Sequence, residues 1–173
     1  RLGDKAGALK FANDALAKDA NNIDALVVLA IERIDERDAA KAIDYLDRGL
    51  KLNERNIALQ LIKVQAFESI ARLDSAEQVY RRLIALYPGT PALRQALAQF
   101  FLSHGRRDAA EAEFRAIIAE KPDDLPSRLD FIRFVGSVKG PKAALQELEG
   151  MIAKDPGNDE LKFAVAGLHQ SMN

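Results

Sequence analysis

The strongest constraint on this 173-residue chain is a pattern that recurs every 34 residues without an insertion. Alanine occupies one place in five successive copies, which are Ala8, Ala42, Ala76, Ala110 and Ala144. A second series at the same step is small or aliphatic and comprises Ala30, Val64, Ala98, Ile132 and Ala166. Periods of roughly 20–50 residues are typical of proteins that stack one supersecondary unit on the next. The sequence therefore predicts a repeat architecture whose core runs through successive units.

Each period contains two predicted helices. In the first complete copy, apolar residues recur at spacings of three and four over about 23–34 and again over about 39–52. Thr90-Pro91 and Gly140-Pro141 are typical of helix starts, and Gly105 is typical of a left-handed helix end. No segment alternates apolar and polar residues over the length of a strand. We therefore expect an all-α chain.

The two small-residue series predict where the helices cross. Helix axes that approach closely leave room only for a small side chain, so an alanine of one helix should face a small residue of the other. Larger aliphatic residues should fill the space beside the crossing, and this series comprises Leu16, Leu50, Ile84, Ile118 and Ile152. One helix pair cannot bury its apolar face alone, whereas stacked pairs bury a continuous core.

The expected organisation is one solenoid over residues 1–173. Its parts are a partial repeat, four full repeats and a terminal helix, at 1–22, 23–56, 57–90, 91–124, 125–158 and 159–173. The chain opens at Arg1 instead of Met, and its first predicted helix is the second member of a pair. We therefore expect this chain to be a fragment of a longer protein.

In length and phase, the chain resembles a tetratricopeptide repeat (TPR) protein. That family has a 34-residue unit with small residues at three places and a proline near its end, and the prolines here are Pro88, Pro122 and Pro156. The chain departs from the family at the tryptophan place, which holds Leu26, Gln60, Arg94, Arg128 and Lys162. Arg33 and Lys63 also stand where apolar residues are usual. The resemblance implies an all-α, right-handed superhelical solenoid of antiparallel helix pairs.

Composition excludes several classes of function. The chain has 25 basic and 26 acidic residues and a pI near 6.2, whereas a nucleic-acid binder usually carries a basic face. It contains no cysteine, and its two histidines, His104 and His169, lie in different repeats. The longest wholly apolar run is 25–31, far short of the roughly 20 residues of a membrane-spanning helix. We therefore expect no catalytic residues, no cofactor, no metal, no nucleic-acid partner and no membrane insertion of this segment.

The resemblance implies a concave groove lined by the first helix of each pair. The groove residues expected in the two N-terminal full repeats are Val27, Val28, Ile31, Ile34, Leu61, Ile62 and Gln65. Those expected in the next two repeats are Gln95, Gln99, Leu102 and Arg133. An apolar groove with amide groups suits an amphipathic helix or an extended peptide, because glutamine both donates to and accepts from a peptide backbone. The alternative for Val27, Val28 and Ile31 is that they only pack against neighbouring repeats.

Some TPR domains grip the acidic tails of chaperones with lysine, arginine and asparagine side chains on successive first helices. The corresponding residues here are Val27 and Ile31, then Ile62, then Ala92 and Ala96. Neither this set nor the set that begins one repeat later supplies the cations. The sequence therefore does not predict a carboxylate clamp of that kind.

The function expected from the sequence is that of a non-catalytic scaffold, which binds a peptide or helix of another protein in the groove. The alternative is a structural spacer or self-association module inside a larger multi-repeat protein, which would make the chain a homo-oligomer. The compartment stays open between the cytoplasm and a bacterial cell envelope.

Overall fold

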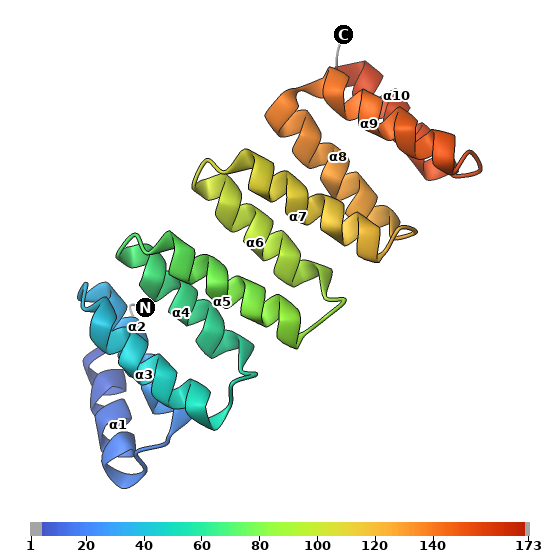
Figure 1. Ribbon diagram of the computed structural model, residues 1–173. Helices are drawn as coiled ribbons and strands as arrows, with labels where there is room; N and C mark the ends of the chain where they lie inside the picture. The colour runs from blue at the N-terminus through green and yellow to red at the C-terminus, as the bar shows by residue number, and fades with distance from the viewer. Residues whose placement is uncertain (1–4, 172–173) are drawn as a thin grey trace. The chain divides into compact units, whose positions relative to one another are not determined.

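The computed structural model describes residues 5–171, and side chains over residues 5–169. This part of the chain consists of ten α-helices and contains no strand (Figure 1). The first members of the helix pairs are α2 (Ile23–Asp35), α4 (Ile57–Ser69), α6 (Pro91–Ser103), α8 (Leu125–Lys139) and α10 (Asp159–Ser171). The second members are α1 (Lys5–Lys18), α3 (Ala39–Leu52), α5 (Leu73–Leu86), α7 (Arg107–Glu120) and α9 (Pro141–Lys154). Both sets begin at intervals of 34 residues, and the predicted all-α fold is confirmed.

The chain divides into two compact units, residues 1–90 and 91–173. Unit 1 contains α1 to α5 and unit 2 contains α6 to α10. In each unit, consecutive helices pack antiparallel as hairpins (Figure 1). The first helices α2 and α4 of unit 1 also contact each other directly. The organisation of the whole chain as one continuous domain stays a prediction.

The alanine series lies at the helix crossings. Ala42, Ala76, Ala110 and Ala144 are fully buried, and Ala30 packs with Ala42 in one apolar cluster of unit 1. Ala8 and Ala166, which hold the same places at the two ends, are exposed. The difference follows from the pairing, because within residues 5–171 no first helix precedes α1 and no second helix follows α10.

The ends of the helices repeat at the same interval. The side chains of Asn22, Asn56, Asp124 and Asn158 each accept a hydrogen bond from the backbone N–H three residues on, at 2.9–3.2 Å. Each of these side chains satisfies one of the free N–H groups at the start of a first helix. The residues that follow the first helices, Arg37, Ala71 and Gly105, all have left-handed backbones, with φ of 63°, 55° and 73°.

Candidate functional site

The outward surface of the first helices is the face on which the sequence placed a groove. We call it the first-helix face and define it by the fifth, sixth, ninth and twelfth residues of α2, α4, α6 and α8. Its ninth residues are exposed in all four helices and comprise Ile31, Gln65, Gln99 and Arg133. The other predicted groove residues on this face are half-buried. Exposure on this face therefore recurs with the repeat.

In unit 1 the first-helix face is apolar on α2 and mixed on α4, where Gln65 and Glu68 are its polar members. Val27, Ile34 and Ile62 pack against one buried cluster that includes Ala30 and Leu46, while Val28 packs against a second cluster near α1. Leu61 is also half-buried. These side chains thus pack against the buried core and still expose part of their surface to solvent. Ile31 belongs to neither cluster, and its side chain is 44% exposed.

In unit 2 the same face is mixed, and its polar residues are Gln95, Gln99, Asp130 and Arg133. The amide nitrogen Nε2 of Gln95 in α6 donates to Oδ2 of Asp130 in α8 at 3.0 Å, and the guanidinium of Arg133 pairs with the same carboxylate. Gln95 is therefore engaged in holding two first helices together. Gln99 is exposed and Leu102 is half-buried. The amide that unit 2 offers to a ligand on this face is thus that of Gln99.

The place of the family's tryptophan, the fourth residue of each first helix, is taken by polar side chains in three successive repeats. Gln60 and Arg128 both donate to the backbone oxygen six residues back, Gln60 Nε2 to Glu54 at 3.1 Å and Arg128 Nε to Pro122 at 2.5 Å. Arg94 instead donates to the carboxylates of Glu113 and Glu120 on α7, each at 2.9 Å. These side chains tie each first helix to the preceding turn or to its own partner helix.

Two clefts open between successive second helices, on a surface that the sequence did not single out. The α3–α5 cleft of unit 1 has a volume of about 930 Å³ and is floored by Gln60, Lys63 and Phe67 of α4. The α7–α9 cleft of unit 2 has a volume of about 420 Å³ and is floored by Arg128 and Phe131 of α8. The clefts take the same place in the repeat. The sequence signals for them were Gln60, Lys63 and Arg128, polar residues at places that the family usually fills with apolar ones.

His104, one of the two histidines, is held by contacts within its own helix. Nδ1 of His104 lies 2.8 Å from the backbone oxygen of Phe100 and 3.1 Å from Oγ of Ser103. Among the described residues, no three His, Asp or Glu side chains are grouped so that they could hold a metal ion. No helix within 5–171 has the length and apolar character needed to span a bilayer.

The stacked pairs of α-helices define a helical-repeat protein of the α-solenoid class. Residues 71–129 match the family model described as "Tetratricopeptide repeat". Over these residues the chain is similar to the tetratricopeptide repeat family. Proteins of this kind are generally non-catalytic scaffolds for protein–protein interaction.

Solved structures share this fold at low sequence identity. The crystal structure of MamA is 21% identical, with a TM-score of 0.59 over 89% of this chain and 90% of MamA. The thermophilic TPR protein TTC0263 of Thermus thermophilus is 19% identical, with a TM-score of 0.55 over 98% of this chain and 92% of that one. YrrB, described as a TPR protein with an unusual peptide-binding site, is 11% identical, with a TM-score of 0.53 over 93% of this chain and 83% of YrrB. No curated protein sequence matches the chain.

Proposed function

We propose that this chain binds a peptide or an amphipathic helix of another protein on its first-helix face. The observation that carries the proposal is the exposure of Ile31. This side chain is 44% exposed, while Val27, Val28 and Ile34 around it on α2 are half-buried. A partner that covers them removes apolar surface from water, which contributes about 25 cal/mol per Å². Because the helices of this chain are already folded, the conformational entropy lost on binding is mainly that of the partner.

The two units offer different chemistry to such a partner. Unit 1 presents aliphatic side chains that suit the apolar side of an amphipathic helix. Unit 2 presents the amide of Gln99 and the guanidinium of Arg133, which can bond to backbone carbonyls or to a carboxylate. The peptide-binding site described for YrrB supports peptide binding as a use of this fold.

The alternative is self-association or a spacer role, and one observation favours it. Phe11 on α1 is 78% exposed, and the residue one repeat on, Tyr45, packs against both apolar clusters of unit 1. A second copy that covers α1 would bury Phe11 in the same manner. This reading predicts a dimer in which the apolar surface of unit 1 is shared between copies.

Affinity capture with matched variants tests the proposal. The parent chain and Ala40→Glu, a change at an exposed position of α3, should retain the same partner from a lysate of the source organism. Ile31→Glu should lose that partner and keep the helical circular dichroism of the parent. Equal capture by the parent, Ala40→Glu and Ile31→Glu would contradict a binding site at Ile31. Light scattering separates the alternative, because self-association predicts a dimer that Phe11→Glu dissociates.

Gln99→Ala tests whether unit 2 takes part in the same binding. The side chain is exposed, so we expect unchanged folding and a weaker hold on the captured partner. Unchanged affinity would restrict the site to unit 1.

A further inference from the structure

The two most exposed large apolar side chains among the described residues stand on α1 and α10. Phe11 of α1 is 78% exposed and Phe163 of α10 is 76% exposed, whereas the next, Leu52, is 48% exposed. α1 is the second helix of a pair and α10 is the first helix of a pair, and within residues 5–171 neither has its other member. Each of these two helices therefore leaves uncovered the face that a pair partner covers in the rest of the chain.

The other repeats show that both places are covered when the helix pair is complete. The place of Phe11 is buried or half-buried in each of the four other second helices, where it is held by Tyr45, Val79, Glu113 and Glu147. The place of Phe163 is half-buried in each of the four other first helices, where it is held by Val27, Leu61, Gln95 and Leu129. The exposure of the two phenylalanines thus follows from the missing partner helices and not from their place in the repeat.

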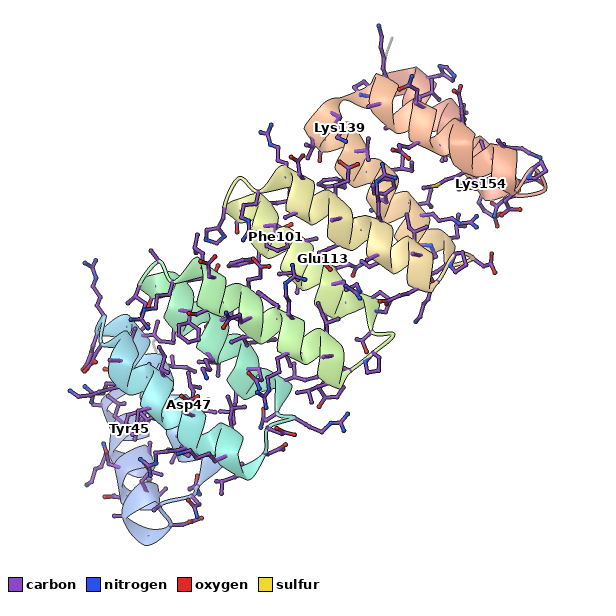
Figure 2. The ribbon with its side chains drawn as sticks, in the orientation of Figure 1. Tyr45, Asp47, Phe101, Glu113, Lys139 and Lys154 are labelled. Atoms are coloured by element: carbon purple, nitrogen blue, oxygen red, sulfur yellow. The ribbon has the colours of Figure 1, made fainter. Side chains whose placement is uncertain are left out.

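A complete pair in unit 1 shows which residues meet across this kind of interface. Ala30 of α2 lies in one buried cluster with Ala42 and Leu46 of α3. Val27 of α2 and Tyr45 of α3, which is labelled in Figure 2, pack against the same cluster. The interface between the two helices is therefore apolar and joins two places of the first helix to three places of the second.

α10 and α1 carry the two halves of the same interface. The two places of the first helix are held in α10 by Phe163 and Ala166, and the three places of the second helix are held in α1 by Ala8, Phe11 and Ala12. All five side chains are apolar. Phe163 is larger than the valine at its place in α2, and Ala12 is smaller than the leucine at its place in α3, so the two changes in volume oppose each other. The exposed face of α10 is thus complementary to that of α1.

We propose that copies of this chain stack head to tail, with α10 of one copy packed against α1 of the next as an antiparallel helix pair. Each contact joins two different surfaces, so a bound copy still offers a free α1 or a free α10, and the assembly does not stop at a dimer. This arrangement gives self-association a specific geometry that differs from a symmetric contact through unit 1. It does not rest on peptide binding by the first-helix face. The ninth residue of a first helix stays exposed beside another first helix, as Gln65 does in α4.

One pair of like charges limits the strength of this contact. In unit 2, Nε of Arg94 in α6 donates to the carboxylate of Glu120 in α7 at 2.9 Å. The same two places are held by Lys162 of α10 and Lys18 of α1, which would face each other between copies. Asp159 offsets the charge of Lys162, because its carboxylate lies 2.8 Å from the ammonium. We therefore expect a concentration-dependent association that becomes tighter as salt screens the two ammonium groups.

Two variants that each block one end test the proposal. Phe11→Glu blocks α1 and leaves α10 intact, whereas Phe163→Glu blocks α10 and leaves α1 intact. Each variant alone should be a monomer, because every contact needs one intact α1 and one intact α10. Their equimolar mixture should form a 1:1 complex of twice the 19.0 kDa monomer mass and nothing larger, while the parent should exceed that mass as its concentration rises. Sedimentation equilibrium measures all four samples.

Several results would overturn the head-to-tail contact. One is a parent chain that stays monomeric at millimolar concentration, and another is a mixture of the two variants that remains monomeric. A dimer of Phe163→Glu alone would indicate a symmetric contact between two copies of α1. A dimer of Phe11→Glu alone would indicate a symmetric contact between two copies of α10.

Matched controls place the same charge elsewhere on the two helices. Ala17→Glu lies on α1 at a place that is exposed in every second helix, and Gly167→Glu lies on α10 at the exposed ninth place. Both should associate as the parent does. Ile31→Glu should also associate as the parent does, because Ile31 lies at neither end. A loss of stacking and a loss of peptide binding are therefore distinguishable.

Lys18→Glu tests the antiparallel pairing of α10 with α1 directly. It places a carboxylate opposite Lys162, as Glu120 lies opposite Arg94 within unit 2. The association constant should rise at least threefold, whereas Ala17→Glu, which adds an acid one residue earlier, should leave it unchanged. Weaker association of Lys18→Glu than of the parent would contradict this pairing of the two helices.

Discussion

Asp47 and Lys63 join two consecutive helix pairs of unit 1, with Oδ1 of the carboxylate 2.5 Å from Nζ of the ammonium. Lys63 is the seventh residue of α4, and its side chain is only 19% exposed. The same place holds the buried residues Leu29, Leu97 and Phe131 in other first helices. Its ammonium also lies 5.7 Å from the ring centroid of Phe67. A contact between charges thus replaces an apolar contact at this one interface.

Lys63→Leu should leave the free energy of unfolding within about 1 kcal/mol of the parent or raise it, because the leucine fills a place that is apolar in other first helices while Asp47, at 45% exposure, keeps its contact with water. Lys63→Glu should lower it by roughly 1–3 kcal/mol, since it places a second carboxylate beside Asp47 with no partner for either. Urea denaturation followed by circular dichroism measures both. If Lys63→Leu were as unstable as Lys63→Glu, the ion pair itself would be what holds the two repeats together.

The buried alanines predict a sharp size limit at the helix crossings. Ala76→Leu and Ala110→Leu should each lower the free energy of unfolding by about 1–3 kcal/mol, because the added atoms must displace close-packed neighbours. Ala8→Leu is the matched control, since it changes the same place in the repeat where the side chain is exposed. Thermal unfolding compares the three variants. An unchanged melting temperature for Ala76→Leu and Ala110→Leu would contradict the crossing geometry.

The left-handed residue in the turn between the helices of a pair should stabilise the fold when it is glycine and destabilise it when it is alanine. Ala71 adopts φ 55°, a left-handed conformation that costs a residue with a Cβ roughly 1–2 kcal/mol. Ala71→Gly should therefore raise the free energy of unfolding by up to about 1 kcal/mol. Gly105→Ala should lower it by a similar amount, because Gly105 has φ 73°. Denaturant midpoints of the two variants are compared with the parent, and shifts of the same sign would rule out backbone conformation as their cause.

The repeat made most of the fold predictable. The 34-residue step located both helices of each pair, and Pro91 and Pro141, which marked predicted helix starts, are the first residues of α6 and α9. The left-handed turn was predicted at Gly105, where glycine marks it. The same step places Ala71 and Arg37 in the equivalent turns, but neither residue type signals a positive φ. The residue type therefore predicted the left-handed backbone in only one of these three equivalent turns.

The candidate sites were less predictable, because they depend on which side chains meet across helices. The sequence marked Arg94 as a departure from the family but could not show that its partners would be Glu113 and Glu120 of α7. Glu111 likewise pairs with Lys139 of α8 as well as with Arg115 one turn later. Long flexible side chains reach several partners, and sequence spacing does not choose among them.

Low pH should lower the stability of the fold by protonating carboxylates that pair with cations in the folded state. The pKa of Glu111 is lowered from its usual 4.5, chiefly by the hydrogen bond from the ammonium of Lys139, with Arg115 adding to the effect. A lowered pKa in the folded state means that the stabilisation is complete above the pKa of the unfolded chain. It is lost as pH falls through the folded value. The denaturant midpoint should therefore fall on acidification below about pH 4.5.

Glu111→Gln should lower stability at pH 7 and flatten this acid dependence, because the amide keeps its shape but has no proton to bind on acidification. Glu149→Gln is the control, since Glu149 is exposed on α9 and forms no contact with a cation among the described residues. Urea midpoints measured from pH 7 to pH 3 compare the two variants with the parent. The linkage requires the parent and Glu149→Gln to lose stability in parallel, while the curve of Glu111→Gln converges with them at low pH. Parallel curves for all three chains would show that Glu111 is not among the groups that acid releases.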